Sequence, residues 1–230
     1  MVLRARATHR MKWIIRIAAA YALAAGTALA AASNPSREVA IEAQSFRVVP
    51  SESGPVNYYT LVRAPEPHWH AAYRPPFKTA VLGYAIPEGN RRSVARIKWK
   101  WRAVVLPKGG DECTEGKGDS AAVVYVTFRR ALRWYSLKYV WSAAAKKGAS
   151  CARKRNPFRA QDTIIVDSGP PLNEWRSVEI DPDAEFRKHF EGGDPHADVP
   201  DLIGIAIMTD GDQTASPSEA DYGGFSLVLR

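Results

Sequence analysis

The chain has few of the residues that mark the common catalytic and cofactor-binding classes. Its 230 residues include two cysteines, and neither has a second ligand at the spacing that zinc sites use. No glycine-rich stretch has the spacing and the strand–loop–helix context of a phosphate or dinucleotide loop, and there is no nucleophile elbow. These absences argue against a zinc protein, a nucleotide-binding enzyme and a hydrolase built on such an elbow.

Long apolar runs are missing except near the N-terminus, where the pattern is that of a secretory leader. Five basic residues between Arg4 and Arg16 precede an alanine-rich run from Ile17 to Leu29. This run is shorter than the roughly 20 residues that span a bilayer, which favours a cleaved signal peptide over a retained membrane anchor. We expect residues 1–30 to be the signal peptide, with cleavage after Ala30 or Ala32. Two methionines can start it: Met1 and Met11.

Acidic residues are outnumbered by basic ones, but most of the excess belongs to the leader. The formal net charge is +8, and it falls to +3 without the five basic residues of the leader. The short basic run at 153–155 is more typical of a solvated loop than of a phosphate-binding patch. We therefore expect a periplasmic or secreted protein that binds no nucleic acid and, once the leader is removed, no membrane.

The two cysteines form a candidate disulfide. Cys113 and Cys151 each lie in a polar loop that contains glycine and follows an apolar run. Because an exported chain meets an oxidising compartment, where an even number of cysteines tends to be bridged, we predict a Cys113–Cys151 disulfide.

Most of the remaining chain has the pattern of short strands. Ile97–Val104 alternates between apolar and charged residues, which places Trp99 and Trp101 together on a core face. Ala121–Phe128 and Leu202–Met208 are continuous apolar runs typical of central strands, and we expect the second to be buried on both faces. Roughly ten such strands, with turn signals every 8–12 residues or so, indicate a β-sandwich or barrel.

One segment has the pattern of a helix. Asp181 can serve as its N-cap, Pro182 suits the first helical position, and Phe186 and Phe190 share a face before a glycine pair. No internal repeat, long linker or composition break follows the leader. We predict a mainly β, jelly-roll-like β-sandwich with one short helix, forming a single monomeric domain over residues 31–230.

Candidate functional residues gather around the last two predicted strands. Asp210 and Asp212 follow an apolar strand directly, Asp221 lies just before the final strand, and Asp119 precedes another core strand. Loop carboxylates held by core strands favour a binding site. Such groups can accept hydrogen bonds from a ligand, act as an acid–base pair on a glycosidic bond, or accept backbone N–H groups in a tight turn.

Calcium and aromatic stacking are two further possibilities. Asp210 and Asp212 offer oxygen ligands to calcium, but Ala215 stands where an EF-hand loop needs glycine, so only another kind of calcium site remains. No other cofactor is indicated. Trp134 and Tyr135 are expected at the surface, where aromatic rings can stack on sugars.

Several segments together resemble an uncharacterised family of exported bacterial proteins, domain of unknown function 3047. They are Trp99–Arg102, Gly118–Val126, Tyr139–Ser142, Trp175, the helix after Asp181 and, most clearly, Ile203–Phe225. Two positions depart from the family pattern: Ser120 stands where a second acidic residue is common, and Gln213 stands where asparagine is common. The resemblance implies an exported β protein but no established activity. The order of a late apolar strand, a carboxylate loop and an aromatic residue is also similar to carbohydrate-binding jelly rolls, which is a likeness of architecture only.

The sequence thus predicts an exported β-sandwich that binds a polar ligand, foremost an envelope glycan. The candidate ligand-binding residues are Asp119, Asp210, Asp212, Asp221, Trp134 and Tyr135. Two alternatives stay open: a glycan hydrolase or lyase that uses paired carboxylates, and a structural or interaction protein without a small ligand.

Overall fold

The computed structural model describes residues 36–50, 54–56 and 58–230, apart from the side chains of residues 152 and 153. The predicted leader lies outside these residues, so its cleavage stays a prediction. Within this part of the chain, no helix is long and apolar enough to cross a membrane.

The elements are β1 (Arg37–Ala40), η1 (Ala43–Ser45), β2 (Arg47–Val48), β3 (Tyr59–Val62), β4 (His68–Tyr73), β5 (Val81–Ala85), η2 (Glu88–Asn90), β6 (Val94–Val105), β7 (Ala122–Arg130), β8 (Arg133–Ser142), β9 (Ser150–Arg155), β10 (Arg159–Ser168), β11 (Arg176–Ile180), α1 (Pro182–Phe190), β12 (Asp201–Met208) and β13 (Ser218–Leu229).

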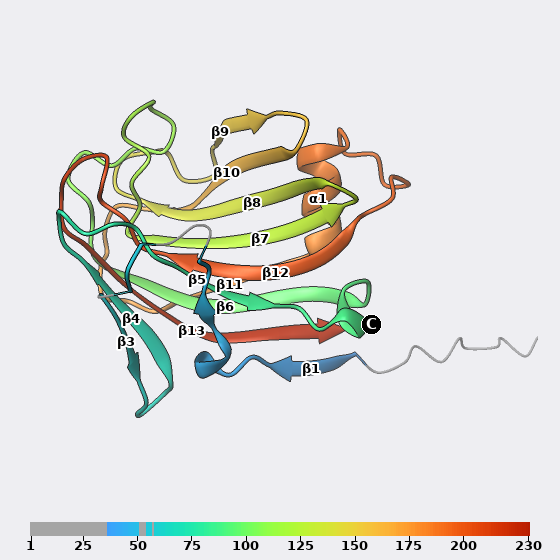
Figure 1. Ribbon diagram of the computed structural model, residues 1–230, viewed down its shortest axis with the longest axis horizontal. Helices are drawn as coiled ribbons and strands as arrows, with labels where there is room; N and C mark the ends of the chain where they lie inside the picture. The colour runs from blue at the N-terminus through green and yellow to red at the C-terminus, as the bar shows by residue number, and fades with distance from the viewer. Residues whose placement is uncertain (1–35, 51–53, 57) are drawn as a thin grey trace, which may run out of the picture. The chain divides into compact units, whose positions relative to one another are not determined.

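The strands form two sheets packed face to face (Figure 1). Sheet A has the order β11-β6-β13-β4-β3, with β1 also paired to β13, and sheet B has the order β2-β5-β12-β7-β8-β10-β9. The chain crosses between the sheets repeatedly, because β5, β7 and β12 belong to sheet B whereas β6, β11 and β13 belong to sheet A. The pairs are antiparallel except for β8 and β10, which run parallel. The predicted jelly-roll-like β-sandwich with one α-helix is confirmed.

The core between the sheets is built from alternate residues of facing strands. On β6, Trp99 and Trp101 are 1% and 0% exposed. This confirms the core position that the alternation of apolar and charged residues predicted for both. The ring centre of Trp99 lies 5.6 Å from that of Tyr139, and Trp101 lies 6.3 Å from Trp141, both on β8 of the opposite sheet. Burying each such side chain stabilises the fold by roughly 1.5–3 kcal/mol.

Helix α1 closes one end of this core. The Asp181 carboxylate accepts the N–H groups of Asp183 and Ala184 at 3.0 Å each, which confirms the predicted N-cap and contributes about 1 kcal/mol. Phe186 is fully buried, with its ring centre 5.2 Å from that of Tyr135. Because α1 covers Tyr135 in this way, the ring is only 7% exposed, and the prediction that it lies at the surface is wrong.

The predicted disulfide is confirmed. The sulfur atoms of Cys113 and Cys151 are 2.08 Å apart. The bond joins the long loop between β6 and β7 to the edge strand β9 of sheet B. It therefore anchors a loop that contains little regular structure of its own.

The outer face of sheet B is covered at one end only. There a small apolar cluster includes Val123, Val140 and Ile165, with Cys151 packed against it. Further along β12, Ile205 and Ile207 enter the main core while Gly204 and Ala206, on the other face, are only half-buried. The prediction that this strand is buried on both faces is therefore wrong at Gly204 and Ala206, although it holds at Met208, whose outward side chain is 7% exposed and belongs to the small cluster.

Candidate functional site

Three of the four predicted carboxylates meet at one end of sheet B. Asp119 precedes β7, while Asp210 and Asp212 follow β12, and these two strands are antiparallel neighbours. One carboxylate oxygen from each of Asp119, Asp210 and Asp212 lies within 4.8 Å of the others. We call these three residues the acidic cluster.

Two members of the acidic cluster are bonded to the protein's own loops. Asp119 is fully buried and accepts both the N–H and the hydroxyl of Thr214 at 2.6 Å. Asp210 is 5% exposed and accepts the N–H of Ser120 at 2.8 Å. Asp212 alone is exposed. The cluster therefore fastens the β12–β13 loop to the loop before β7, and Asp119 and Asp210 present little surface to a ligand.

Lys138 of β8 balances the charge of the acidic cluster. It is 8% exposed, and its ammonium group donates to the carbonyl oxygen of Gly118 at 3.2 Å. Burial raises the pKa of Asp210 to about 7, and the nearby Asp119 and Asp212 add to the increase although Lys138 opposes it. Burial by itself lowers the pKa of Lys138, but Tyr125 and the nearby carboxylates outweigh it, so this pKa is raised.

The raised pKa of Asp210 predicts a pH-dependent stability. The pKa of Asp210 is about 7 in the folded chain against an ordinary value of 3.8. Between these two pH values the carboxyl group is therefore protonated in the folded state and ionised in the unfolded state. The contribution of Asp210 to the free energy of unfolding therefore falls by roughly 2–4 kcal/mol as the pH rises through this window. Urea unfolding at intervals from pH 4.5 to 8 measures this fall.

Asp210→Asn tests the assignment, because the amide keeps the acceptor for Ser120 but cannot ionise. We expect its stability to vary less with pH than that of the wild type. The control Asp194→Asn, at an exposed position beyond α1, should retain the wild-type slope. Equal slopes in all three proteins would contradict the assignment.

Calcium binding by Asp210 and Asp212 stays a prediction. The oxygen atoms of the acidic cluster are close enough for a hard cation to bridge them. However, Asp119 and Asp210 already accept protein hydrogen bonds, and Lys138 already supplies a positive charge. These contacts account for the cluster without an ion.

Asp221 does not join the acidic cluster. It lies within β13 rather than in the preceding loop, on the face of sheet A that points away from the core. There it is 1% exposed and pairs with His70, at 2.7 Å, and with Arg102. The predicted grouping was wrong for this residue, because the final strand begins at Ser218, three residues before Asp221, rather than after it.

Trp134 also lies away from the acidic cluster. It is the second residue of β8 and pairs with Arg129 near the far end of β7, whereas the cluster lies beyond the first residue of β7. At about 3.3 Å per residue, the two ends of β7 are more than 20 Å apart. The predicted site of carboxylates with a stacking Trp134 is therefore split between two regions of sheet B.

Trp134 instead borders a groove on the outer face of sheet B. The groove has a volume of about 710 Å³ and crosses β5, β12, β7, β8 and β10. Its floor includes the small residues Gly204 and Ala206. The uncharged polar side chains along it include Thr127, Ser136 and Gln161, and the aromatic ones include Tyr125 and Trp134.

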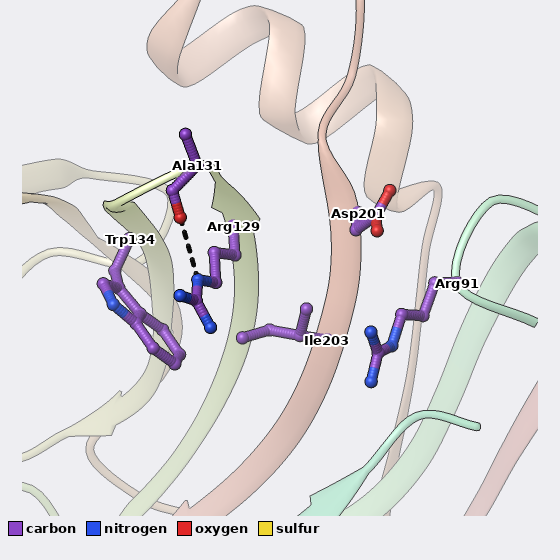
Figure 2. A pocket seen from close by; sticks show the side chains of 6 residues that line it. All are labelled: Arg91, Arg129, Ala131, Trp134, Asp201 and Ile203. Atoms are coloured by element: carbon purple, nitrogen blue, oxygen red, sulfur yellow. Dashed lines mark hydrogen bonds between the residues drawn. The ribbon is translucent and has the colours of Figure 1, made fainter. Parts of the chain in front are cut away.

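The groove continues into a second pocket of about 420 Å³, with which it shares Trp134 and Ile203. Figure 2 shows Arg129 beside Trp134 and Arg91 across Ile203 from them. The guanidinium carbon of Arg129 lies 5.1 Å from the ring centre of Trp134, and its Nε donates to the carbonyl oxygen of Ala131 at 2.9 Å. We call the two pockets together the sheet B groove.

The fold and this groove define a class of protein: a β-sandwich with a ligand-sized groove across the outer face of one sheet. The sequence profile described as "Protein of unknown function (DUF3047)" matches residues 78–226. The chain belongs to this family, as the sequence predicted. No curated protein matches the chain.

Several solved structures are similar to the chain at about one-tenth identity. The family 11 carbohydrate-binding module from Clostridium thermocellum, in complex with a mixed-linked β-1,3-1,4 tetrasaccharide, has 11% identity and a TM-score of 0.43 over 86% of this chain and 98% of its own. The xyloglucanase domain of NopAA, a type three effector from Sinorhizobium fredii, in complex with cellobiose, has 10% identity and a TM-score of 0.45 over 86% and 99%. Endoglucanase 3 of family GH12 from Trichoderma harzianum has 11% identity and a TM-score of 0.41 over 86% and 98%. Likenesses this distant say nothing about which residues of this chain bind a ligand.

Proposed function

We propose that this protein binds a polysaccharide in the sheet B groove. The observation that carries the proposal is an exposed tryptophan at one end of an open groove whose floor is made of small residues. Trp134 is 40% exposed, and the adjoining groove has a volume within the range of about 300–1,000 Å³ typical of ligand sites. Because the groove crosses five strands that are about 4.8 Å apart, its length suits an extended ligand.

The side chains along the groove have the chemistry that a sugar chain requires. A sugar ring has an apolar face, which stacks on an aromatic ring such as that of Trp134, and a rim of hydroxyl groups that need hydrogen-bonding partners. Thr127, Ser136 and Gln161 supply donors and acceptors on three adjacent strands of sheet B. These strands give the polar groups a rigid spacing, which lowers the entropy cost of binding.

Hydrolysis by the acidic cluster is not part of this proposal. A glycosidase needs two carboxyl groups that reach the scissile bond from opposite sides. Asp119 and Asp210 are buried and already accept protein hydrogen bonds, so they would have to leave these partners to meet a substrate. Their arrangement supports a structural role in holding two loops together.

We also propose that the protein acts outside the cytoplasm. Its Cys113–Cys151 disulfide is of a kind that persists in oxidising compartments, and the leader predicted over residues 1–30 would deliver the chain to one. A periplasmic or secreted protein would meet envelope polysaccharides directly.

The binding site can be tested by filling the groove. Ala206 is half-buried and faces the groove, because its neighbours Ile205 and Ile207 enter the core. Ala206→Trp would therefore occupy the floor and remove most binding in calorimetric titrations against a panel of neutral and acidic soluble polysaccharides. A matched control is Ala72→Trp, at a half-buried position whose neighbours Ala71 and Tyr73 enter the core from sheet A.

The control variant should bind as the wild type does. If the wild type binds no polysaccharide of the panel, the proposal fails and the structural alternative gains support. If Ala206→Trp binds as tightly as Ala72→Trp, the ligand lies elsewhere on the molecule.

A further inference from the structure

We propose that the ligand of the sheet B groove is an acidic polysaccharide whose sugars carry carboxylate groups. This inference rests on the proposed function and adds the substrate class. It is carried by two arginine side chains, Arg91 and Arg129, that line the groove and have no carboxylate partner among the described residues.

The lining of the groove is strongly cationic. The two pockets together include Arg47, Arg91, Arg129 and Arg159, with Asp201 as their one carboxylate among the described residues. Asp201 already accepts the Nε of Arg92 at 2.6 Å. At Arg91 and Arg129 the groove therefore presents positive charge that a neutral glycan would leave uncompensated, although the chain without its predicted leader has a net charge of only +3.

Arg91 and Arg129 retain most of their hydrogen-bonding capacity. The Nε of Arg91 donates to the carbonyl oxygen of Ile86 at 3.3 Å, and that of Arg129 donates to Ala131. Within the described part of the chain, neither guanidinium forms an ion pair, whereas Arg92 and Arg130 beside them do. Their terminal N–H groups are thus available to an anion in the groove.

The two guanidinium groups flank one strand. Arg129 of β7 pairs with Asp201 of β12, and on the other side of β12 the carbonyl oxygen of Arg91 accepts the N–H of Leu202 at 3.2 Å. Their backbones are therefore about 10 Å apart, at two strand spacings. In Figure 2 both side chains border the same pocket, with Ile203 between them and Trp134 next to Arg129.

Carboxylates fit this arrangement better than phosphates do. A guanidinium group binds a carboxylate through two parallel hydrogen bonds, and separated arginines match charges that are spread along a chain, one to a sugar. A polyphosphate or nucleic-acid backbone is denser in charge and usually meets clusters of cations that include lysine. Among the described residues, no lysine lines the groove. An acidic sugar held by Arg129 would also lie beside the ring of Trp134.

The test compares neutral and acidic ligands on the full mature chain. Affinities are measured by calorimetry for a neutral β-glucan, a polyuronate and a phosphate-bearing polysaccharide, at low and at high salt. We expect the polyuronate to bind at least about tenfold tighter than the neutral glucan, with the difference shrinking at about 1 M salt, where charges are screened within about 3 Å.

Arg91→Gln and Arg129→Gln should each weaken polyuronate binding about tenfold more than they weaken binding of the neutral glucan, and the pair about a hundredfold more. The control Arg63→Gln removes the same charge from the exposed turn after β3 of sheet A and should leave polyuronate binding unchanged. Melting temperatures verify that each variant is folded.

The outcomes separate this inference from the proposed function. Tighter binding of the neutral glucan, or of the phosphate-bearing polymer, would overturn the carboxylate assignment but leave a polysaccharide-binding groove. Equal losses in Arg63→Gln and Arg129→Gln would overturn it as well, because binding would then follow net charge. Binding of none of the three polymers would overturn the proposed function itself.

Discussion

Replacing Trp134 with alanine is expected to weaken polysaccharide binding about thirtyfold, because a tryptophan that forms a binding hot spot typically contributes about 2 kcal/mol or more. The ring is 40% exposed and borders both pockets of the sheet B groove. The guanidinium carbon of Arg129 lies over the ring, 5.1 Å from its centre. Fluorescence titration with the best ligand of the panel measures the change.

Trp175 provides a matched control. It too is 40% exposed and lies beside an arginine, with the guanidinium carbon of Arg102 5.0 Å from its ring centre. It precedes β11 of sheet A, away from the groove, so Trp175→Ala should bind as the wild type does. A similar loss in both variants would show that tryptophan removal acts through the fold rather than through the groove.

Removing the disulfide is expected to have the largest effect on stability. Cys113 and Cys151 are separated by 38 residues, and closing a loop of that length lowers the entropy of the unfolded chain. The chain-entropy relation gives about 4 kcal/mol for this loop. We expect Cys113→Ser/Cys151→Ser to unfold at a correspondingly lower urea concentration than the oxidised wild type.

The reduced wild type serves as the control, because it loses the bond but keeps both cysteines. Its stability should match that of the double variant. The loss should also be visible locally: hydrogen exchange should rise first in the loop between β6 and β7, whose link to β9 is gone. A loss below about 1 kcal/mol would mean that the loop is already fixed by its other contacts.

The fold was largely predictable because its signals are local. The alternation in β6 placed Trp99 and Trp101 in the core, and the Asp181–Pro182 pair marked the start of α1. Each of these patterns depends on neighbouring residues and on the period of one element. The disulfide was predictable for a different reason, since the described chain has only these two cysteines to pair.

The candidate site was less predictable because it depends on which strands become neighbours. Asp119 and Asp210 were both singled out, but only the pairing of β7 with β12 brings them together. Their burial depends on hydrogen bonds from distant loop residues and on the positive charge of Lys138 on β8. Tyr135 was misplaced because a ring that alternates with surface residues can still be covered by a helix from far along the chain.

The sheet B groove itself was missed. Gly204 and Ala206 were taken for residues of a doubly buried strand, since small apolar residues are compatible with burial on either face. One signal was available in the sequence: Thr127 and Arg129 alternate with buried Val126 and Phe128, which marks a polar outer face. That signal predicts an exposed face but not the hollow that several strands form together.

The most direct test of the central claim is a crystal structure of the protein with an oligosaccharide cut from its tightest-binding polysaccharide. The account predicts the sugar chain across β12 in the sheet B groove, with one ring against Trp134 and, for an acidic sugar, a carboxylate on Arg91 or Arg129. A sugar bound at the acidic cluster, or on the outer face of sheet A near Asp221, would contradict it.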